Sequence, residues 1–269
     1  MRSSASDIRA VSVAGIALAS FLLLAGADRA GPGLPATALR SLAIQLLLAG
    51  LALAAAARMK RPVREALGLA PSRLRARQSL WLVASTLGLS HALYTGLELS
   101  GGSDASSLGA LGELLEGASL PALGLALVGL ALAPSLGEEL LCRGLLQRAL
   151  LRRSGPGWAI AISSATFAAL HLDPVHAIFA APLGVQLGLA AHLGGSTRTS
   201  MLCHLANNTV AIGLAATGGL IPEGSPTSAA LGLAIWGGSW GALWRGLPPG
   251  NPGSGDGSGL QYDGKPVDR

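Results

Sequence analysis

The stretch SLPALGLALVGLALAPSLGEELLCR, residues 119–143, is apolar almost throughout and ends in two adjacent glutamates and an arginine. About 20 apolar residues are enough for a helix to cross the hydrocarbon core of a membrane. The stretch therefore predicts a transmembrane helix over about 119–141. Ionisable residues at membrane depth are energetically unfavourable, so the carboxylates near its end are candidates for chemistry.

The whole chain has the composition of a membrane protein. It has 269 residues, of which 50% are hydrophobic and only 12% charged, and its mean hydropathy is +0.51. Soluble domains carry roughly a quarter charged residues. Two cysteines exclude a disulfide-stapled secreted domain. The net charge of +5 comes from basic segments between apolar runs, which is typical of a membrane protein rather than a nucleic-acid-binding protein.

Further apolar runs resemble the first one. They lie at about 8–27, 34–57, 79–97, 158–172, 175–193, 200–217 and 227–243. We therefore expect an all-α fold: a polytopic membrane bundle of about eight transmembrane helices around an intramembrane polar cavity. The chain divides into N-terminal helices with a basic cytoplasmic loop (1–118), a core (119–245) and a Gly/Pro/Ser-rich tail (246–269) that we expect to be disordered.

The charges of the loops predict the orientation. The segment 58–77 has seven basic residues and one acidic residue, whereas 98–118 is acidic and has no Lys or Arg. The positive-inside rule then places both termini in the cytoplasm. A composition rich in Ala, Leu, Gly and Arg suggests a bacterial cytoplasmic membrane. Alternatively, the first apolar run is a signal peptide, with a small-residue cleavage site at Ala25–Ala27.

The two adjacent carboxylates have different surroundings on a helix. Glu139 and Arg143 are four residues apart, so they share a face and can pair. Glu138 points about 100° away and has no partner in its own helix. One carboxylate is thus predicted to be structural and the other free for chemistry. The alternative is a solvated helix end at the membrane surface.

Two later runs carry polar residues with the same spacing. Phe167 and His171 are four residues apart, as are His204 and Asn208. A carboxylate can act as general base on water, and His and Asn can donate hydrogen bonds to an oxyanion. Together these groups suit peptide-bond hydrolysis without a covalent intermediate. Taken singly, each pair could equally be a packing contact or a polar link between helices.

The three motifs in this order resemble the CPBP family of intramembrane proteases, which includes the type II CAAX prenyl endopeptidases (Rce1-like) and bacteriocin-processing and immunity relatives. The family pattern is Glu-Glu-x-x-x-Arg, Phe-x-x-x-His and His-x-x-x-Asn/Asp. The resemblance implies that Glu138 activates water beside His171. It implies an oxyanion hole made by His204 and Asn208. It gives Glu139, Arg143 and Phe167 supporting roles.

One feature of the sequence conflicts with this arrangement. His171 lies near the outer end of its run and Glu138 near the inner end of its own. Either the fourth helix sits deeper in the membrane than its run suggests, or Asp173–Pro174 ends a tilted or broken helix inside the bundle.

Two other functions remain open. Glu138, His171 and His204 could instead bind a catalytic zinc ion, although the Asn suits an oxyanion hole better and no cofactor is the first expectation. The chain could also be a non-catalytic immunity or binding protein. The expected partners are membrane lipid and a peptide or protein substrate, whether lipidated or membrane-embedded.

Overall fold

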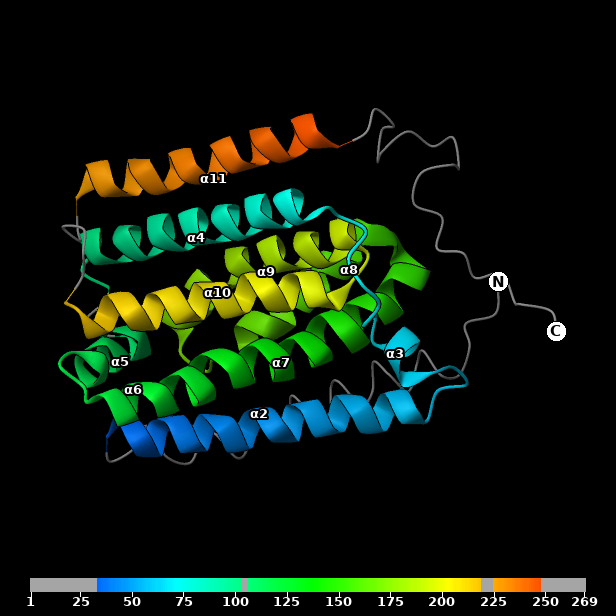
Figure 1. Cartoon of the computed structure of the whole chain (residues 1–269), viewed down its shortest axis with the longest axis horizontal. Coiled ribbons are helices and arrows are strands. Elements are labelled where there is room, and N and C mark those ends of the chain that lie inside the picture. Colours follow the sequence, from blue (N-terminus) through cyan, green and yellow to red (C-terminus); the bar gives the residue numbers. More distant parts are fainter. Residues whose placement is uncertain (1–32, 103–105, 219–224, 248–269) are drawn as a thin grey trace.

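The computed structural model describes residues 33–102, 106–218 and 225–247, and every regular element in these ranges is a helix (Figure 1). The all-α prediction is therefore confirmed for this part of the chain. The expected first span at 8–27, its reading as a signal peptide and residues 248–269 of the tail lie outside the described residues.

Five of the predicted spans correspond to single helices. These are α2 (Leu34–Ala57), α4 (Ala76–Leu99), α9 (Pro174–Gly194), α10 (Thr197–Ala216) and α11 (Pro226–Gly246). Two short helices lie in the predicted loops, α3 (Val63–Ala66) in the basic loop and α5 (Ser107–Leu115) in the acidic one. The sequence analysis did not predict either, and α5 becomes part of the site described below.

The fourth predicted span is longer than expected. It begins with α6 (Leu120–Ala126) and α7 (Ala133–Glu139) and continues into α8 (Arg148–Ala169), with the π-helices η1 (Leu127–Leu132) and η2 (Leu140–Gln147) on either side of α7. The first break comes at Gly155, whose φ of 74° is left-handed and is followed by Pro156. The prediction of a helix end near 141 is therefore wrong. The segment after Gly155 forms the fifth predicted span.

The helices pack closely where glycines face a neighbouring backbone. A Cβ on Gly129 would collide with the backbone of Ala38, and one on Gly137 would lie 2.6 Å from the carbonyl oxygen of Gln45. These glycines therefore let α2 lie directly against η1 and α7. Small residues at helix contacts are typical of membrane bundles, where close backbone packing stabilises the contact.

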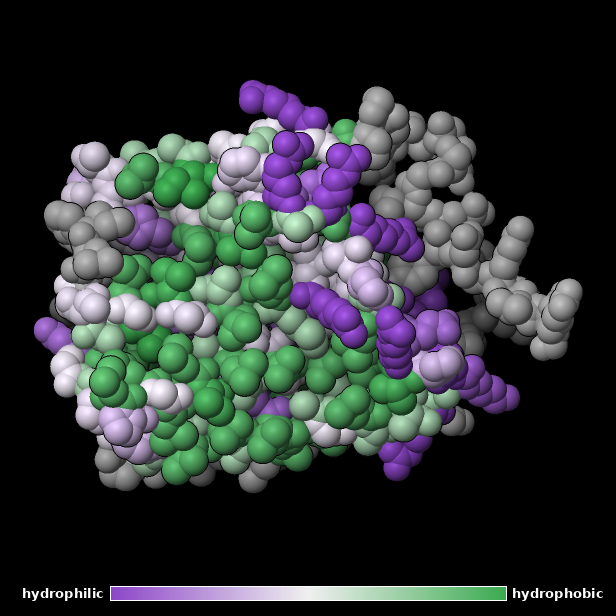
Figure 2. Space-filling model, viewed as in Figure 1, coloured by the Kyte–Doolittle hydropathy of each residue, from purple (hydrophilic) through white to green (hydrophobic). Residues whose placement is uncertain are grey.

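The surface carries many apolar side chains. Leu46, Leu120, Trp158 and Ile178 are all more than half exposed. Apolar residues cover most of the face in Figure 2, and hydrophilic ones gather toward the end where α3 lies in Figure 1. Among the described residues, the segments Leu34–Ala57, Leu120–Ala169 and Pro174–Gly194 are long and apolar enough to cross a membrane. The count of eight spans stays a prediction.

Candidate active site

One cavity of about 580 Å³ is lined by the catalytic residues predicted from the sequence. Its lining includes Glu138 of α7, Phe167 and His171 at the end of α8, and His204 and Asn208 of α10. Sequence spacing could not show that these three helices meet. The structure brings all of the predicted catalytic side chains to a single cavity, with Glu139 and Arg143 directly behind it.

Glu139 and Arg143 form the predicted pair. Arg143 Nη1 donates to Glu139 Oε1 at 2.7 Å, and both side chains are fully buried. Arg143 Nη2 donates to the carbonyl oxygen of Gly184 in α9 at 2.8 Å, and the guanidinium lies 4.5 Å from the centre of the Phe167 ring. Arg143 is therefore not in a basic loop, as its place after the predicted span had suggested. It joins three helices inside the bundle.

Glu138 has a partner on another helix. Gln45 Nε2 of α2 donates to Glu138 Oε1 at 2.6 Å, and the contact is buried. The second carboxylate oxygen, Oε2, lies 3.9 Å from Nε2 of His204. One oxygen is thus held by an amide, and the other faces a histidine without a direct hydrogen bond between them.

The hydrogen bonds of the two histidines define which ring nitrogen carries a proton. His204 Nδ1 lies 3.1 Å from Glu139 Oε1, and His171 Nδ1 lies 3.0 Å from the carbonyl oxygen of Phe167. A carboxylate or a carbonyl only accepts, so both Nδ1 atoms donate. In a neutral ring the Nε2 atom is then an acceptor.

Phe167 separates and orients these two rings. Its ring packs edge-on against His171 at 5.1 Å and against His204 at 5.6 Å between ring centres. The pairing of Phe167 with His171, predicted from their spacing, is confirmed. The contact with His204 was not predicted, because it depends on how α8 and α10 pack.

The amide of Asn208 is held at both ends. Its Nδ2 donates to the carbonyl oxygen of Leu130 in η1 at 3.1 Å, and its Oδ1 accepts from Nδ2 of Asn207 at 3.2 Å. An amide nitrogen has two protons, so one N–H of Asn208 is left for a ligand. Asn207, which the sequence analysis did not single out, also lines the cavity.

A tight turn places His171. The turn follows α8 and includes Leu172, whose φ of 58° is unusual for a residue other than glycine. Asp173 next caps α9 by accepting from the Val175 N–H, and it also accepts from the Ser107 N–H of α5 at 2.6 Å. Burial opposes ionisation of Asp173, but these hydrogen bonds outweigh it and lower its pKa. The turn thereby ties α5 to the end of α9.

The conflict over depth is resolved by the length of the fourth helix. Because the helix continues past Arg143 to Gly155, Glu138 lies near its middle rather than at its inner end. His171 lies in the turn just after the shorter second segment of α8 and lines the same cavity. The helix also breaks at Gly155 and ends in the turn before Asp173–Pro174, as the second explanation expected, so features of both explanations are present.

Two polar residues of the site were missed from the sequence. Gln45 is a single glutamine in an apolar run, and Asn207 directly precedes the motif residue Asn208. Gln45 is only 6% exposed, and a buried amide at membrane depth is the signal that could have identified it. Within the part of the chain that the structure describes, no three His, Cys, Asp or Glu side chains are grouped so that they could hold a metal ion.

The fold and the site together define a helical membrane protein with a buried Glu–His–Asn cavity. Residues 120–210 match the family model described as type II CAAX prenyl endopeptidase Rce1-like. An Rce1-like domain is therefore found in this part of the chain, as the resemblance predicted, and its family is one of proteases. The matched residues include Glu138, His171, His204 and Asn208 but not Gln45. No curated protein and no solved structure matched the chain.

Proposed function

We propose that the protein is an intramembrane endopeptidase in which Glu138 activates a water molecule for attack on a peptide bond. The observation that supports this best is the position of Glu138 Oε2. That oxygen has no direct hydrogen bond to His204 at 3.9 Å, and it lines the same cavity as His171 and Asn208. A water that bridges these groups would lie beside a carboxylate base.

The proton transfers follow from the hydrogen bonds. Glu138 takes a proton from the attacking water, and His171 Nε2, whose ring is fixed by the Phe167 carbonyl, accepts the second hydrogen bond of that water. When the tetrahedral intermediate collapses, Glu138 gives its proton to the leaving amine. The atoms balance, since water adds across the peptide bond and no covalent intermediate forms.

His204 and Asn208 are placed to stabilise the oxyanion, but in different ways. Asn208 has one amide N–H left over after its bond to Leu130. His204 already donates through Nδ1 to Glu139, so it can donate through Nε2 only when both nitrogens are protonated. The buried carboxylate of Glu139 stabilises that cation. Removing one such donor typically costs about 2.7–4 kcal/mol of transition-state stabilisation.

Gln45 is a positioning residue in this mechanism. Its Nε2 occupies Glu138 Oε1 at 2.6 Å, which leaves Oε2 as the oxygen for water. Gln45 Oε1 is buried against α7 and has no hydrogen-bond partner.

The experiment uses the purified full-length protein in detergent, with a quenched fluorescent peptide library as the substrate. We expect hydrolysis by the wild type and none by Glu138→Gln, which keeps the volume and the hydrogen bond from Gln45. A Glu138→Gln variant as active as the wild type would refute the mechanism. A folded wild type that cleaves no member of the library in lipid or detergent would favour the non-catalytic alternative.

The zinc-dependent alternative uses the same residues. A catalytic zinc would need ligand atoms of Glu138, His171 and His204 within about 2.0–2.2 Å of one ion. Metal content and activity after exhaustive chelation distinguish the two mechanisms. Zinc at one ion per chain, with activity lost on chelation and restored by zinc, would establish the metal-dependent protease.

A further inference from the structure

The cavity occupies one half of the bundle. In α4 its lining begins at Thr86, ten residues after the helix starts, and in α10 it begins at His204, seven residues after the start. From there it continues along both helices toward α5, where Leu111 and Glu113 also line it. The catalytic residues are thus at the deep end of a cavity that extends toward α5.

The cavity reaches the surface beside α5. Glu113, Glu116 and Gly218 line it and are exposed. No Lys or Arg is among the described residues of the lining. The open end of the cavity is therefore acidic.

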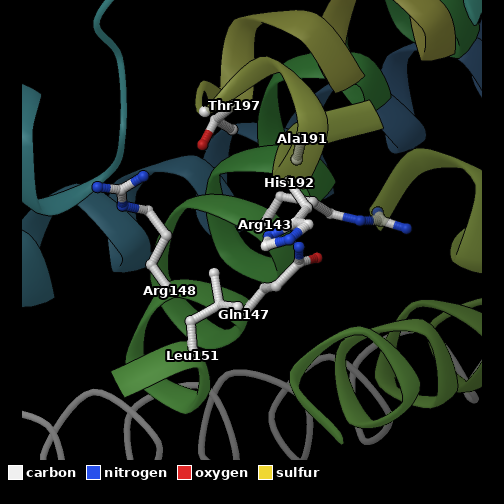
Figure 3. Close-up of a pocket in the computed structure, with 8 residues that line it drawn as sticks. Arg143, Gln147, Arg148, Leu151, Ala191, His192 and Thr197 are labelled. Atoms are coloured by element: carbon white, nitrogen blue, oxygen red, sulfur yellow. The ribbon is translucent and has the colours of Figure 1, made fainter. Parts of the chain in front are cut away.

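On the side of the catalytic residues away from α5, packed side chains of η2 and α9 leave no large cavity. Arg143 and Gln147 donate to the carbonyl oxygens of Gly184 and Gly188, one helical turn apart, which fastens η2 to α9. Leu141 and Leu145 are fully buried beside them. The cavity at that side, between Arg143, Gln147 and His192, measures only about 20 Å³ (Figure 3). That is room for a single water molecule, so a peptide has no path through it.

The basic residues between α2 and α4 gather at this closed end, whereas Arg40 lies in the first third of α2. The loop that joins α2 to α4 carries Arg58, Lys60, Arg61, Arg64, Arg73, Arg75 and Arg77. Arg148 lies against Gly68 of the same loop, and Arg73 lies against Gly195 at the end of α9. Hydrophilic residues cluster at this end of the molecule in Figure 2. Basic ends of membrane helices face the cytoplasm, so the open, acidic end of the cavity faces the other side.

We infer that the substrate reaches Glu138 from the non-cytoplasmic side of the membrane. The substrate class is a peptide segment of an exported or membrane protein, with apolar residues against the cavity walls and a basic residue near Glu113 and Glu116. This inference rests on the proposed hydrolase for its substrate, but the direction of access depends only on the cavity and the basic loops.

Access is tested by cysteine labelling, which needs no hydrolysis. Gly112 lines the cavity on α5, and a Cβ there meets nothing within 4 Å. Gly157, at the closed end, has the same free space and is exposed, so it gives a matched control. The native Cys142 and Cys203 are buried and unreactive toward a sulfonated, membrane-impermeant maleimide.

We expect Gly112→Cys to react in spheroplasts and not in inverted vesicles, and Gly157→Cys to do the reverse. Ser90→Cys, deeper along the cavity, should react from the same side as Gly112→Cys, only more slowly. Reaction of Gly112→Cys and Ser90→Cys only in inverted vesicles would overturn the inference. So would a Ser90→Cys that reacts from neither side while Gly112→Cys reacts, because the cavity would then be closed above the catalytic residues.

The charge preference is tested with peptides in detergent. A hydrolysed library sequence is compared in two forms, with Lys or with Glu in its flanking position. We expect the Lys form to have the higher kcat/KM by about two- to fivefold, the range for exposed ion pairs, and Glu113→Gln together with Glu116→Gln to remove the difference. Equal rates for both forms in the wild type would overturn this part. Absence of any hydrolysis would refute the proposed function and leave the labelling result standing.

Discussion

Glu139→Gln should destabilise the protein far more than the same change at the neighbouring Glu138. The Glu139 side chain is fully buried and accepts from Arg143 at 2.7 Å and from His204 at 3.1 Å. The substitution keeps an acceptor oxygen but leaves the Arg143 charge without a counter-charge. Breaking a buried ion pair in this way costs about 3–5 kcal/mol. Because Arg143 keeps the Gly184 carbonyl at 2.8 Å, we expect the lower end, about 3 kcal/mol.

The assay is unfolding of the detergent-solubilised protein, followed by tryptophan fluorescence, with hydrolysis measured on the same samples. Glu138→Gln is the matched control, because its carboxylate has only Gln45 as a direct partner and the new amide oxygen can still accept from it. We expect that control to unfold within about 1 kcal/mol of the wild type and to be inactive. If Glu139→Gln is as stable as the wild type and inactive, while Glu138→Gln retains activity, the assigned roles of the two carboxylates are reversed.

Three further predictions concern the site and its surroundings. Gln45→Leu should lower kcat and leave KM unchanged. The control is Gln186→Leu, which removes another buried amide that links helices through Ser85 and Trp240 and should lower only the stability. A change in KM alone for Gln45→Leu would contradict its positioning role. Asn208→Ala should reduce kcat by about 100- to 1,000-fold, as for other oxyanion donors, with a normal unfolding midpoint. The pKa of Asp173 is lowered, so its contact with Ser107 stabilises the fold at neutral pH and is lost as the pH falls through that pKa. The fall in melting temperature on acidification should therefore be smaller for Asp173→Asn than for the wild type.

The local part of the site could be predicted from the sequence. The pairs Glu139–Arg143 and Phe167–His171 are four residues apart, and helix geometry alone brings such residues together. Both contacts are present. The same rule separated Glu138 from Arg143, and the structure gives the two carboxylates different partners.

The extent of the fourth helix could not be predicted, because Arg143 was interpreted as the start of a basic loop. A charged residue after an apolar run usually marks the membrane surface. Here the guanidinium is neutralised by Glu139, bonded to the Gly184 carbonyl and stacked on Phe167, so it is 1% exposed inside the bundle. The last two partners, Gly184 and Phe167, belong to α9 and α8. No pattern within residues 119–143 indicates them.

Gln45 shows why the N-terminal helices matter to the chemistry. It is 93 residues from Glu138 along the chain and lies outside the matched domain at 120–210. Its approach depends on Gly137, because a Cβ at that position would lie 2.5 Å from Gln45 Oε1 and 2.6 Å from its backbone carbonyl. The glycine beside the two glutamates thus acts as a packing residue for α2, and it lets the Gln45 amide reach Glu138 Oε1. An intact 120–210 segment without α2 would keep every motif residue and lose the group that holds Glu138 in place.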